Sequence, residues 1–215
     1  MKTGIIFDLD GTLLDTLEDL LDATNYALSV HGYPARTLGE LRTFVGNGAY
    51  NQMRLSVPEG TLPEQIQAVL DTYKPYYTKN CQNKTAPYEG VLEVLTSLGE
   101  KYPLAIVSNK PDAAVKDLCR LYFPGIYALG ETPDLPRKPA PDMVRAGMEA
   151  IGADRCVYVG DSEVDVLMAR NAGVPCLCVT WGFRDEDVLE AAGGVHFCRR
   201  VEEMEEKIEE LIHGQ

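Results

Sequence analysis

The sequence predicts an α/β protein whose core is a doubly wound, Rossmann-like parallel sheet, with an all-helical cap domain inserted into it. Short apolar runs rich in β-branched residues alternate with amphipathic segments over most of the chain, and this alternation is typical of parallel strands joined by right-handed helical crossovers. The stretch between the first strand and about Lys84 breaks the pattern, because it contains only helix-like segments. We therefore expect residues 1–14 and 86–215 to form the core and residues 15–85 to form the cap.

The first strand is a short apolar run that acids follow at once. Ile5, Ile6 and Phe7 are β-branched or aromatic, and Gly11 breaks the strand soon afterwards. Apolar residues then recur at helical spacing up to Leu28, and further helix-like segments follow. The breaks between these segments fall at Gly32, Pro34, Gly46, Gly48, Pro58, Gly60 and Pro63.

After Pro87 the alternation of strands and helices resumes. The expected strands lie near Leu104, Tyr127, Val157, Cys176 and Val195. The expected helices cover residues 91–98, 111–122, the segment after Pro141, residues 164–172, the region of Val188 and the glutamate-rich end of the chain. Strands connected in this way are parallel and are covered by helices on both faces.

The composition excludes several classes of function. The 215 residues carry a formal net charge of -13, which disfavours nucleic acid as a partner because binding to a phosphate backbone needs clustered Lys and Arg. We expect no membrane partner either, because no apolar stretch is long enough to span a bilayer. The six cysteines are scattered and include no C-x-x-C pair, which favours reduced thiols in a cytoplasmic protein over a zinc site or a disulfide framework. We expect a monomer or a homodimer.

Carboxylates follow two of the predicted strands directly. Asp8 and Asp10 follow the first strand, and Asp161 and Asp165 follow a later apolar run. A strict strand would point Asp8 and Asp10 to the same side, where two desolvated carboxylates require a proton or a cation between them. The alternative is an ordinary Asp-Gly turn after the strand.

A hydroxyl, an amide and a cation occupy comparable positions. Ser108 and Asn109 end the strand that begins at Leu104, and Lys138 lies in a loop stiffened by prolines. The loops at the carboxyl ends of an open parallel sheet share one crevice, where ligands bind. Each residue also has a simpler explanation: the serine can cap the next helix, the asparagine can end the strand, and a surface lysine is usually solvated. Four acids near one crevice favour Lys138 as their counter-charge.

Together these residues form four ordered motifs that resemble those of the haloacid dehalogenase superfamily. The motifs are Asp8-x-Asp10-Gly11-Thr12, Ser108-Asn109, Lys138-Pro139 and Gly160-Asp161-x-x-x-Asp165. Two further stretches, residues 11–16 and 42–48, are similar to the phosphoglycolate phosphatase branch of that superfamily. The resemblance extends over nearly the whole chain.

The resemblance implies a phosphatase that works through an aspartyl-phosphate. Asp8 would be the nucleophile, and Asp10 would protonate the leaving group and then activate water. Dehalogenases of the superfamily lack the second acid, so Asp10 argues against dehalogenation. The implied cofactor is Mg²⁺, held by Asp8, the backbone carbonyl of Asp10 and Asp161. Asp165 would hold a ligating water or orient Lys138.

The resemblance also divides substrate binding between the core and the cap. Ser108 and Lys138 would bind the phosphoryl oxygens, and Asn109 could donate to the same group. A short segment of the cap forms either an ordinary glycine turn or a loop whose exposed amides meet the substrate, and its arginine is a candidate partner for a substrate carboxylate. The cap candidates are Arg42, Gly46, Asn47 and Gly48.

The expected substrate is a small phosphate ester, because a modest cap encloses only a small molecule. Phosphoglycolate is the leading candidate by resemblance, whereas sugar phosphates, nucleotides and pyrophosphate remain open. A phosphomutase, a pyrophosphatase or a nucleotidase of the same superfamily is an alternative. A receiver domain that accepts a phosphoryl group belongs to a different class, and it would not need the helical insert.

Overall fold

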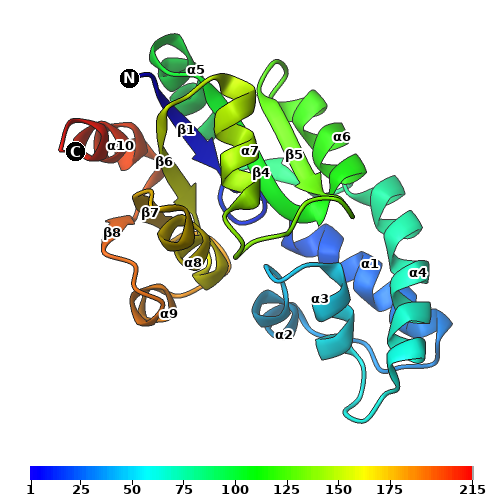
Figure 1. Cartoon of the computed structure of the whole chain (residues 1–215). Helices are drawn as coiled ribbons and strands as arrows, with labels where there is room; N and C mark the ends of the chain where they lie inside the picture. Colours follow the sequence, from blue (N-terminus) through cyan, green and yellow to red (C-terminus); the bar gives the residue numbers. More distant parts are fainter. Residues whose placement is uncertain (215) are drawn as a thin grey trace.

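A six-stranded sheet forms the centre of the computed structural model, which describes residues 1–214 (Figure 1). Its strands are β1 (Thr3–Phe7), β4 (Leu104–Pro111), β5 (Tyr127–Glu131), β6 (Arg155–Gly160), β7 (Cys176–Val179) and β8 (His196–Cys198). Their order across the sheet is β5-β4-β1-β6-β7-β8, and all neighbouring pairs are parallel. The predicted parallel α/β fold is confirmed.

The side chains of β1 alternate between two layers of helices. The helices of the core are α5 (Val91–Lys101), α6 (Asp112–Tyr122), α7 (Asp142–Ile151), α8 (Glu163–Ala172), α9 (Glu186–Ala191) and α10 (Met204–His213), with a 3₁₀ turn over Val201–Glu203. Ile5 and Phe7 belong to the apolar cluster formed with α5, α6 and α10, whereas Ile6 belongs to the cluster formed with α7 and α8. Successive strand residues point to opposite faces of the sheet. Because helices cover both faces, every residue of β1 is buried.

The inserted cap consists of four helices at the carboxyl ends of the strands (Figure 1). They are α1 (Leu17–Val30), α2 (Leu38–Phe44), α3 (Ala49–Ser56) and α4 (Pro63–Asn80). The two linkers to the core pair as short antiparallel strands, β2 (Leu14–Asp15) and β3 (Ala86–Pro87). The predicted helical insert is therefore present, and the boundaries at residues 15 and 85 stay a prediction.

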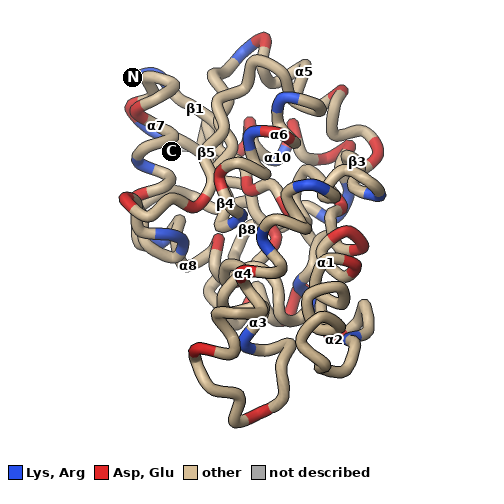
Figure 2. The backbone as a smooth tube through the Cα atoms, turned by 90° about the vertical axis from the view of Figure 1, so that its right-hand side faces the viewer, with Lys and Arg blue, Asp and Glu red and all other residues tan. Residues whose placement is uncertain are grey.

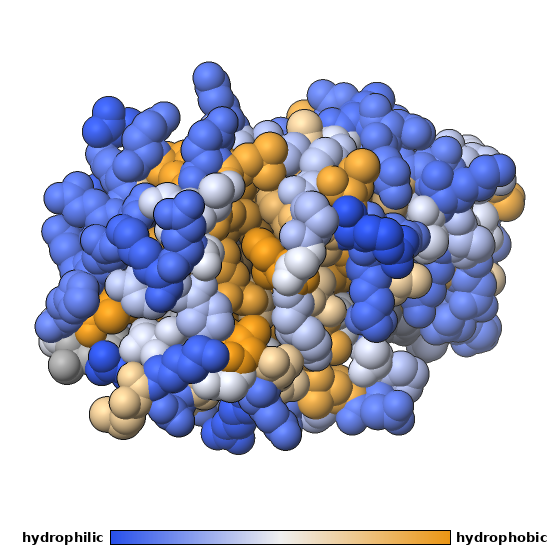
Figure 3. All heavy atoms as spheres, turned by 90° about the horizontal axis from the view of Figure 1, so that it is seen from above, coloured by the Kyte–Doolittle hydropathy of each residue, from blue (hydrophilic) through white to orange (hydrophobic). Residues whose placement is uncertain are grey.

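The surface bears charges of both signs. Lys and Arg are interspersed with Asp and Glu along the chain in Figure 2. Figure 3 views the molecule from the side of the amino ends of the strands, where apolar side chains lie between charged groups. Within residues 1–214, none of the helices combines the length and the apolar character needed to cross a bilayer.

Asp19 joins the first turn of α1 to the second linker. Its carboxylate is buried and accepts hydrogen bonds from the backbone amides of Lys84, at 3.0 and 3.1 Å, and Thr85, at 2.9 Å. The Thr85 hydroxyl donates a further bond of 2.9 Å. A buried carboxylate with several donors fixes the start of the cap against its end, because leaving those donors unpaired is costly.

We expect Asp19→Ala to lower the free energy of unfolding by about 2–3 kcal/mol, since it leaves buried amides without an acceptor. Asp22→Ala is the matched control, because Asp22 lies on the same helix and contacts Lys84 only through an exposed ion pair, which contributes little. Urea unfolding followed by circular dichroism measures both changes. Equal losses in the two variants would contradict the role assigned to Asp19.

Candidate active site

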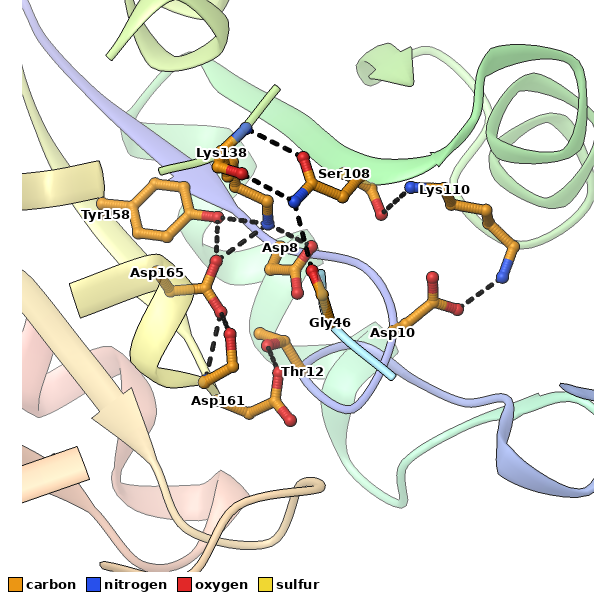
Figure 4. A network of polar contacts seen from close by, with 12 residues as sticks. Asp8, Asp10, Thr12, Gly46, Ser108, Lys110, Lys138, Tyr158, Asp161 and Asp165 are labelled. Carbon is orange, nitrogen blue, oxygen red and sulfur yellow. Dashed lines mark hydrogen bonds and ion pairs between the residues drawn. The ribbon is translucent and has the colours of Figure 1, made fainter. Parts of the chain in front are cut away.

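The polar residues predicted from the sequence gather where β1, β4 and β6 end (Figure 4). A cavity of about 50 Å³ lies there, between the edge of the sheet and the cap. Its core side is lined by Asp8, Asp10, Ser108, Asn109, Lys138 and Asp161, among others. Because β1 lies between β4 and β6, its acids face polar groups that follow both neighbouring strands.

Lys138 is a buried cation at the centre of this group. Its Nζ lies 2.7 Å from Asp8 Oδ1 and 2.8 Å from Asp165 Oδ1, and it donates to the Tyr158 hydroxyl at 3.0 Å. Burial lowers the pKa of Lys138, but the carboxylates of Asp165 and Asp8 outweigh this effect and raise the pKa above its usual value. Lys138 therefore stays charged and balances two buried acids, as the sequence leads us to expect of a counter-charge.

Asp165 uses both of its carboxylate oxygens within the protein. Oδ1 accepts from Lys138 and, at 2.8 Å, from the Tyr158 hydroxyl. Oδ2 accepts from the amide of Ser162 at 3.1 Å and from the Ser162 hydroxyl at 2.6 Å. Ser162 and Asp165 together cap the start of α8. These contacts suit a residue that orients Lys138, and a role for Asp165 as a metal ligand stays a prediction.

Asp161 lies next to Asp8 and is held by the chain around it. Its Oδ1 accepts from the Thr12 hydroxyl at 3.2 Å, and its Oδ2 accepts from the amide of Phe183 at 2.7 Å. Gly11, at φ +81°, has no room for a Cβ because the Asp161 carboxylate occupies that space. Asp161 directly follows β6, and the tight turn after β1 thus holds its carboxylate in place.

The carboxylates of Asp8, Asp161 and Asp165 form a cluster that suits a divalent cation. One oxygen of each lies within 4.8 Å of the others, and Asp8 Oδ1 is buried without an aligned hydrogen-bond donor. Burial raises the pKa of Asp8 well above its usual value, although Lys138 opposes the shift. Burial and the neighbouring Asp165 raise the pKa of Asp161 to about 7. Hard oxygen donors in this arrangement fit Mg²⁺.

Asp10 lies outside that carboxylate cluster. Its Oδ1 is 2.6 Å from Lys110 Nζ and accepts from the Thr16 hydroxyl, also at 2.6 Å. Strand β1 ends at Phe7, so the alternation of side chains along a strand does not determine where the Asp10 side chain points. The expected repulsion between Asp8 and Asp10 is replaced by the ion pair of Asp10 with Lys110. Its backbone carbonyl as a metal ligand stays a prediction.

Asn109 connects the core to the cap. Its Nδ2 donates to the carbonyl oxygens of Lys138 at 3.0 Å and Gly46 at 3.1 Å, and its Oδ1 accepts from the Lys138 amide at 2.9 Å. Ser108 Oγ accepts from the amide of Lys110 at 3.2 Å and lines the cavity. Ser108 can thus face a phosphoryl group, while Asn109 positions the loop that carries Lys138.

The predicted cap residues divide into two groups. Gly46 and Gly48 line the cavity. Arg42 instead contacts Asp185 at 2.9 Å and the carbonyl of Gly182 at 3.2 Å, and Asn47 donates to Glu163 at 3.3 Å. Both residues therefore bridge the cap to the core, and their part in substrate binding stays a prediction.

Two basic residues of the site, Lys110 and Arg184, are not predicted from the sequence. Lys110 directly follows Ser108 and Asn109, so its place at the end of a strand was a usable signal. No comparable sequence pattern marks Arg184, because its contacts join the core to the cap and depend on how the two pack together. It donates to Glu163 and to the carbonyls of Arg42 and Val45, each at 2.7 Å.

Comparison with known proteins agrees with this geometry. Residues 5–179 match the family model of haloacid dehalogenase-like hydrolases. The chain belongs to this family. The phosphoglycolate phosphatase of Rhodobacter capsulatus is 35% identical over 210 residues, which cover 91% of this chain and 93% of that protein. The phosphoglycolate phosphatase of Agrobacterium fabrum is also 35% identical, with 86% and 83% covered.

Solved structures of the family share the whole architecture. A crystal structure from Lactobacillus delbrueckii subsp. bulgaricus, described as a candidate phosphoglycolate phosphatase, superimposes with a TM-score of 0.90 at 37% identity. The match covers 97% of this chain and 99% of that chain. The predicted superfamily and the predicted enzyme class, a phosphatase, are confirmed, and the receiver-domain alternative is set aside.

Proposed function

We propose that this chain is a Mg²⁺-dependent phosphatase that hydrolyses a small phosphate monoester, with 2-phosphoglycolate as the leading substrate. The observation that carries the proposal is the enclosed group formed by Asp8, Lys138 and Asp161 at the end of β1. Relatives named phosphoglycolate phosphatase support the choice of substrate.

The first step is attack of an Asp8 carboxylate oxygen on phosphorus. The bond from phosphorus to the ester oxygen breaks, and Asp10, which must enter this step in its protonated form, gives its proton to the departing alkoxide. Lys138 and the Ser108 hydroxyl hold the phosphoryl oxygens while Lys138 keeps Asp8 in place. Asp8, Asp161 and the Asp10 carbonyl would hold Mg²⁺, which would supply positive charge to the phosphoryl oxygens when bound.

The second step hydrolyses the aspartyl-phosphate. Asp10, now ionised, takes a proton from water, and the water oxygen attacks phosphorus as the bond to Asp8 breaks. Inorganic phosphate leaves, Asp8 returns as a carboxylate and Asp10 is again protonated. One acid thus serves both steps, which requires its carboxyl group to face the leaving oxygen.

The size of the cavity supports a small substrate. Its volume of about 50 Å³ corresponds to roughly three to five water molecules, at about 10–15 Å³ for each. A phosphoryl group alone is about this size, so the space favours an ester with a short remainder over a bulky one. Larger esters would require the cap to move away from the core.

The covalent route predicts different defects for the two acids. Asp8→Asn should abolish turnover and any acid-stable phosphoprotein, because an amide is a poor nucleophile. Asp10→Asn should lower kcat for 2-phosphoglycolate by about 100-fold or more, yet still allow Asp8 to be labelled by p-nitrophenyl phosphate, whose leaving group needs no proton. Steady-state assays and acid-quenched mass spectrometry measure these effects. Unchanged turnover in Asp10→Asn would rule out its acid-base role.

Metal binding should depend on pH. Because the pKa of Asp161 is raised to about 7, the folded metal-free protein holds a proton between about pH 4 and pH 7 that the unfolded chain has lost, and its stability falls as pH rises through this window. Mg²⁺ needs the ionised carboxylates. Saturating Mg²⁺ should therefore raise Tm more at pH 8 than at pH 5.5, as measured by calorimetry.

Asp161→Asn is the matched control for that measurement, since it keeps the size of the side chain and removes the charge. Its Tm should respond little to Mg²⁺ at either pH. Equal Mg²⁺ shifts in the wild type at pH 5.5 and pH 8 would contradict the link between the raised pKa and metal binding.

A panel of small phosphate esters tests the substrate. We expect kcat/KM to be highest for 2-phosphoglycolate among sugar phosphates, nucleotides, pyrophosphate and p-nitrophenyl phosphate. If a sugar phosphate or pyrophosphate ranks first, the choice of substrate is wrong while the phosphatase proposal stands. If a sugar 1-phosphate is isomerised only with a bisphosphate primer, the protein is a mutase.

A further inference from the structure

Lys110 is a buried cation of the cavity to which the mechanism above gives no part. It follows β4 residues Ser108 and Asn109, lines the cavity and leaves only 2% of its side chain exposed. Its Nζ lies 2.6 Å from Asp10 Oδ1 and 4.6 Å from the centre of the Tyr77 ring. A buried ammonium group is tolerated only with a partner of opposite charge, and Asp10 is the carboxylate paired with it (Figure 4).

In the proposed mechanism this pair separates. Asp10 must turn its carboxyl group toward the ester oxygen and later toward water, whereas in this structure both Lys110 and Thr16 hold Asp10 Oδ1. When Asp10 moves, Lys110 keeps its place under the cap and has lost its counter-charge. A substrate that supplies an anion at that moment satisfies Lys110, and a neutral substrate leaves it unpaired.

We infer that Lys110 binds an anionic group of the substrate on the leaving-group side, a carboxylate, in exchange for Asp10. This inference rests on the proposed function. Because Lys110 is in contact with Asp10, and Asp10 serves the ester oxygen, the carboxylate must lie close to that oxygen. In 2-phosphoglycolate a single methylene separates the ester oxygen from the carboxylate carbon, which suits this spacing.

The other residues of the cavity wall leave Lys110 as the partner for the substrate on that side, which favours an anionic group of the substrate over an uncharged one. The cap contributes Leu20, Ala49, Gln52 and Tyr73, none of which is charged. Arg42 is occupied by Asp185 and does not line the cavity. The other cations that line the cavity, Lys138 and Arg184, are paired with Asp8 and Glu163. Lys110 is thus the lining cation that contacts Asp10. The site discriminates against a substrate that lacks the carboxylate, because such a substrate leaves the buried Lys110 without a counter-charge.

The test compares 2-phosphoglycolate with its amide, 2-phosphoglycolamide, which has nearly the same shape and no carboxylate. In the wild type we expect kcat/KM for the acid to exceed that for the amide by about 100-fold or more, as expected for a buried charge pair. In Lys110→Met the ratio should fall to about one. Lys116→Met is the matched control, because Lys116 is an exposed lysine on α6 paired with Asp112, and it should keep the wild-type ratio.

Binding without turnover gives a second measurement. Titration calorimetry of the Asp8→Asn protein with the acid and the amide should show the same preference, which the added Lys110→Met change removes. The wild-type comparisons need no Lys110 variant, so they test the inference even if Lys110→Met fails to fold.

Three outcomes separate the inference from the proposed function. If the wild type hydrolyses both esters equally well, or if Arg42→Ala rather than Lys110→Met removes the preference, the inference is overturned and the phosphatase proposal stands. If the wild type hydrolyses neither these esters nor p-nitrophenyl phosphate, the proposed function fails. Loss of the preference in Lys110→Met alone supports the assignment.

Discussion

The buried contact of Lys138 with Asp8 and Asp165 is the interaction on which the site depends. Three carboxylates converge where β1 and β6 end, and burial would force protons onto them without a nearby cation. Lys138 comes from the loop after β5, so its charge also fixes that loop against β6 and α8 on the other side of β1. Removing the cation would leave buried charges uncompensated, which is far more damaging than losing an exposed ion pair. The ion pairs that hold Asp8, the proposed nucleophile, thus also stabilise this corner of the fold.

Much of this arrangement could be predicted from the sequence because its signals are local. The continuous apolar run of Ile5, Ile6 and Phe7 indicates a buried strand, and the acids directly after it place Asp8 at the end of that strand. The partners of Asp10 could not be predicted in this way. They depend on where β1 ends and on how the cap approaches β4, and no spacing in the sequence encodes the meeting of Asp10 with Lys110. For the same reason Arg42 could be read as a substrate ligand, although its guanidinium reaches Asp185 in the core.

The contacts between cap and core explain why the cavity is enclosed. Arg184 donates to the carbonyls of Arg42 and Val45, and Asn109 donates to the carbonyl of Gly46. Both residues thus bind backbone carbonyls at the end of α2 and directly after it, and the side chains of Arg42 and Asn47 add further contacts from the cap to the core. Asn109 also holds the backbone of Lys138. Contact with the cap and placement of Lys138 therefore share one side chain, and opening the cap would disturb both.

Two buried lysines divide the cavity between them. Lys138 is paired with Asp8, the nucleophile of the proposed mechanism, and Lys110 is paired with Asp10, its proposed acid and base. The first pair can persist through the reaction, because the phosphoryl group adds negative charge beside Lys138. The second pair separates in the proposed mechanism, when Asp10 turns toward the ester oxygen. A phosphatase with only the first lysine would accept any ester that fits, since phosphoryl recognition is the same for all of them. The second lysine makes the chemical step sensitive to what the phosphate is attached to, and this sensitivity arises from a buried charge rather than from the shape of the cap.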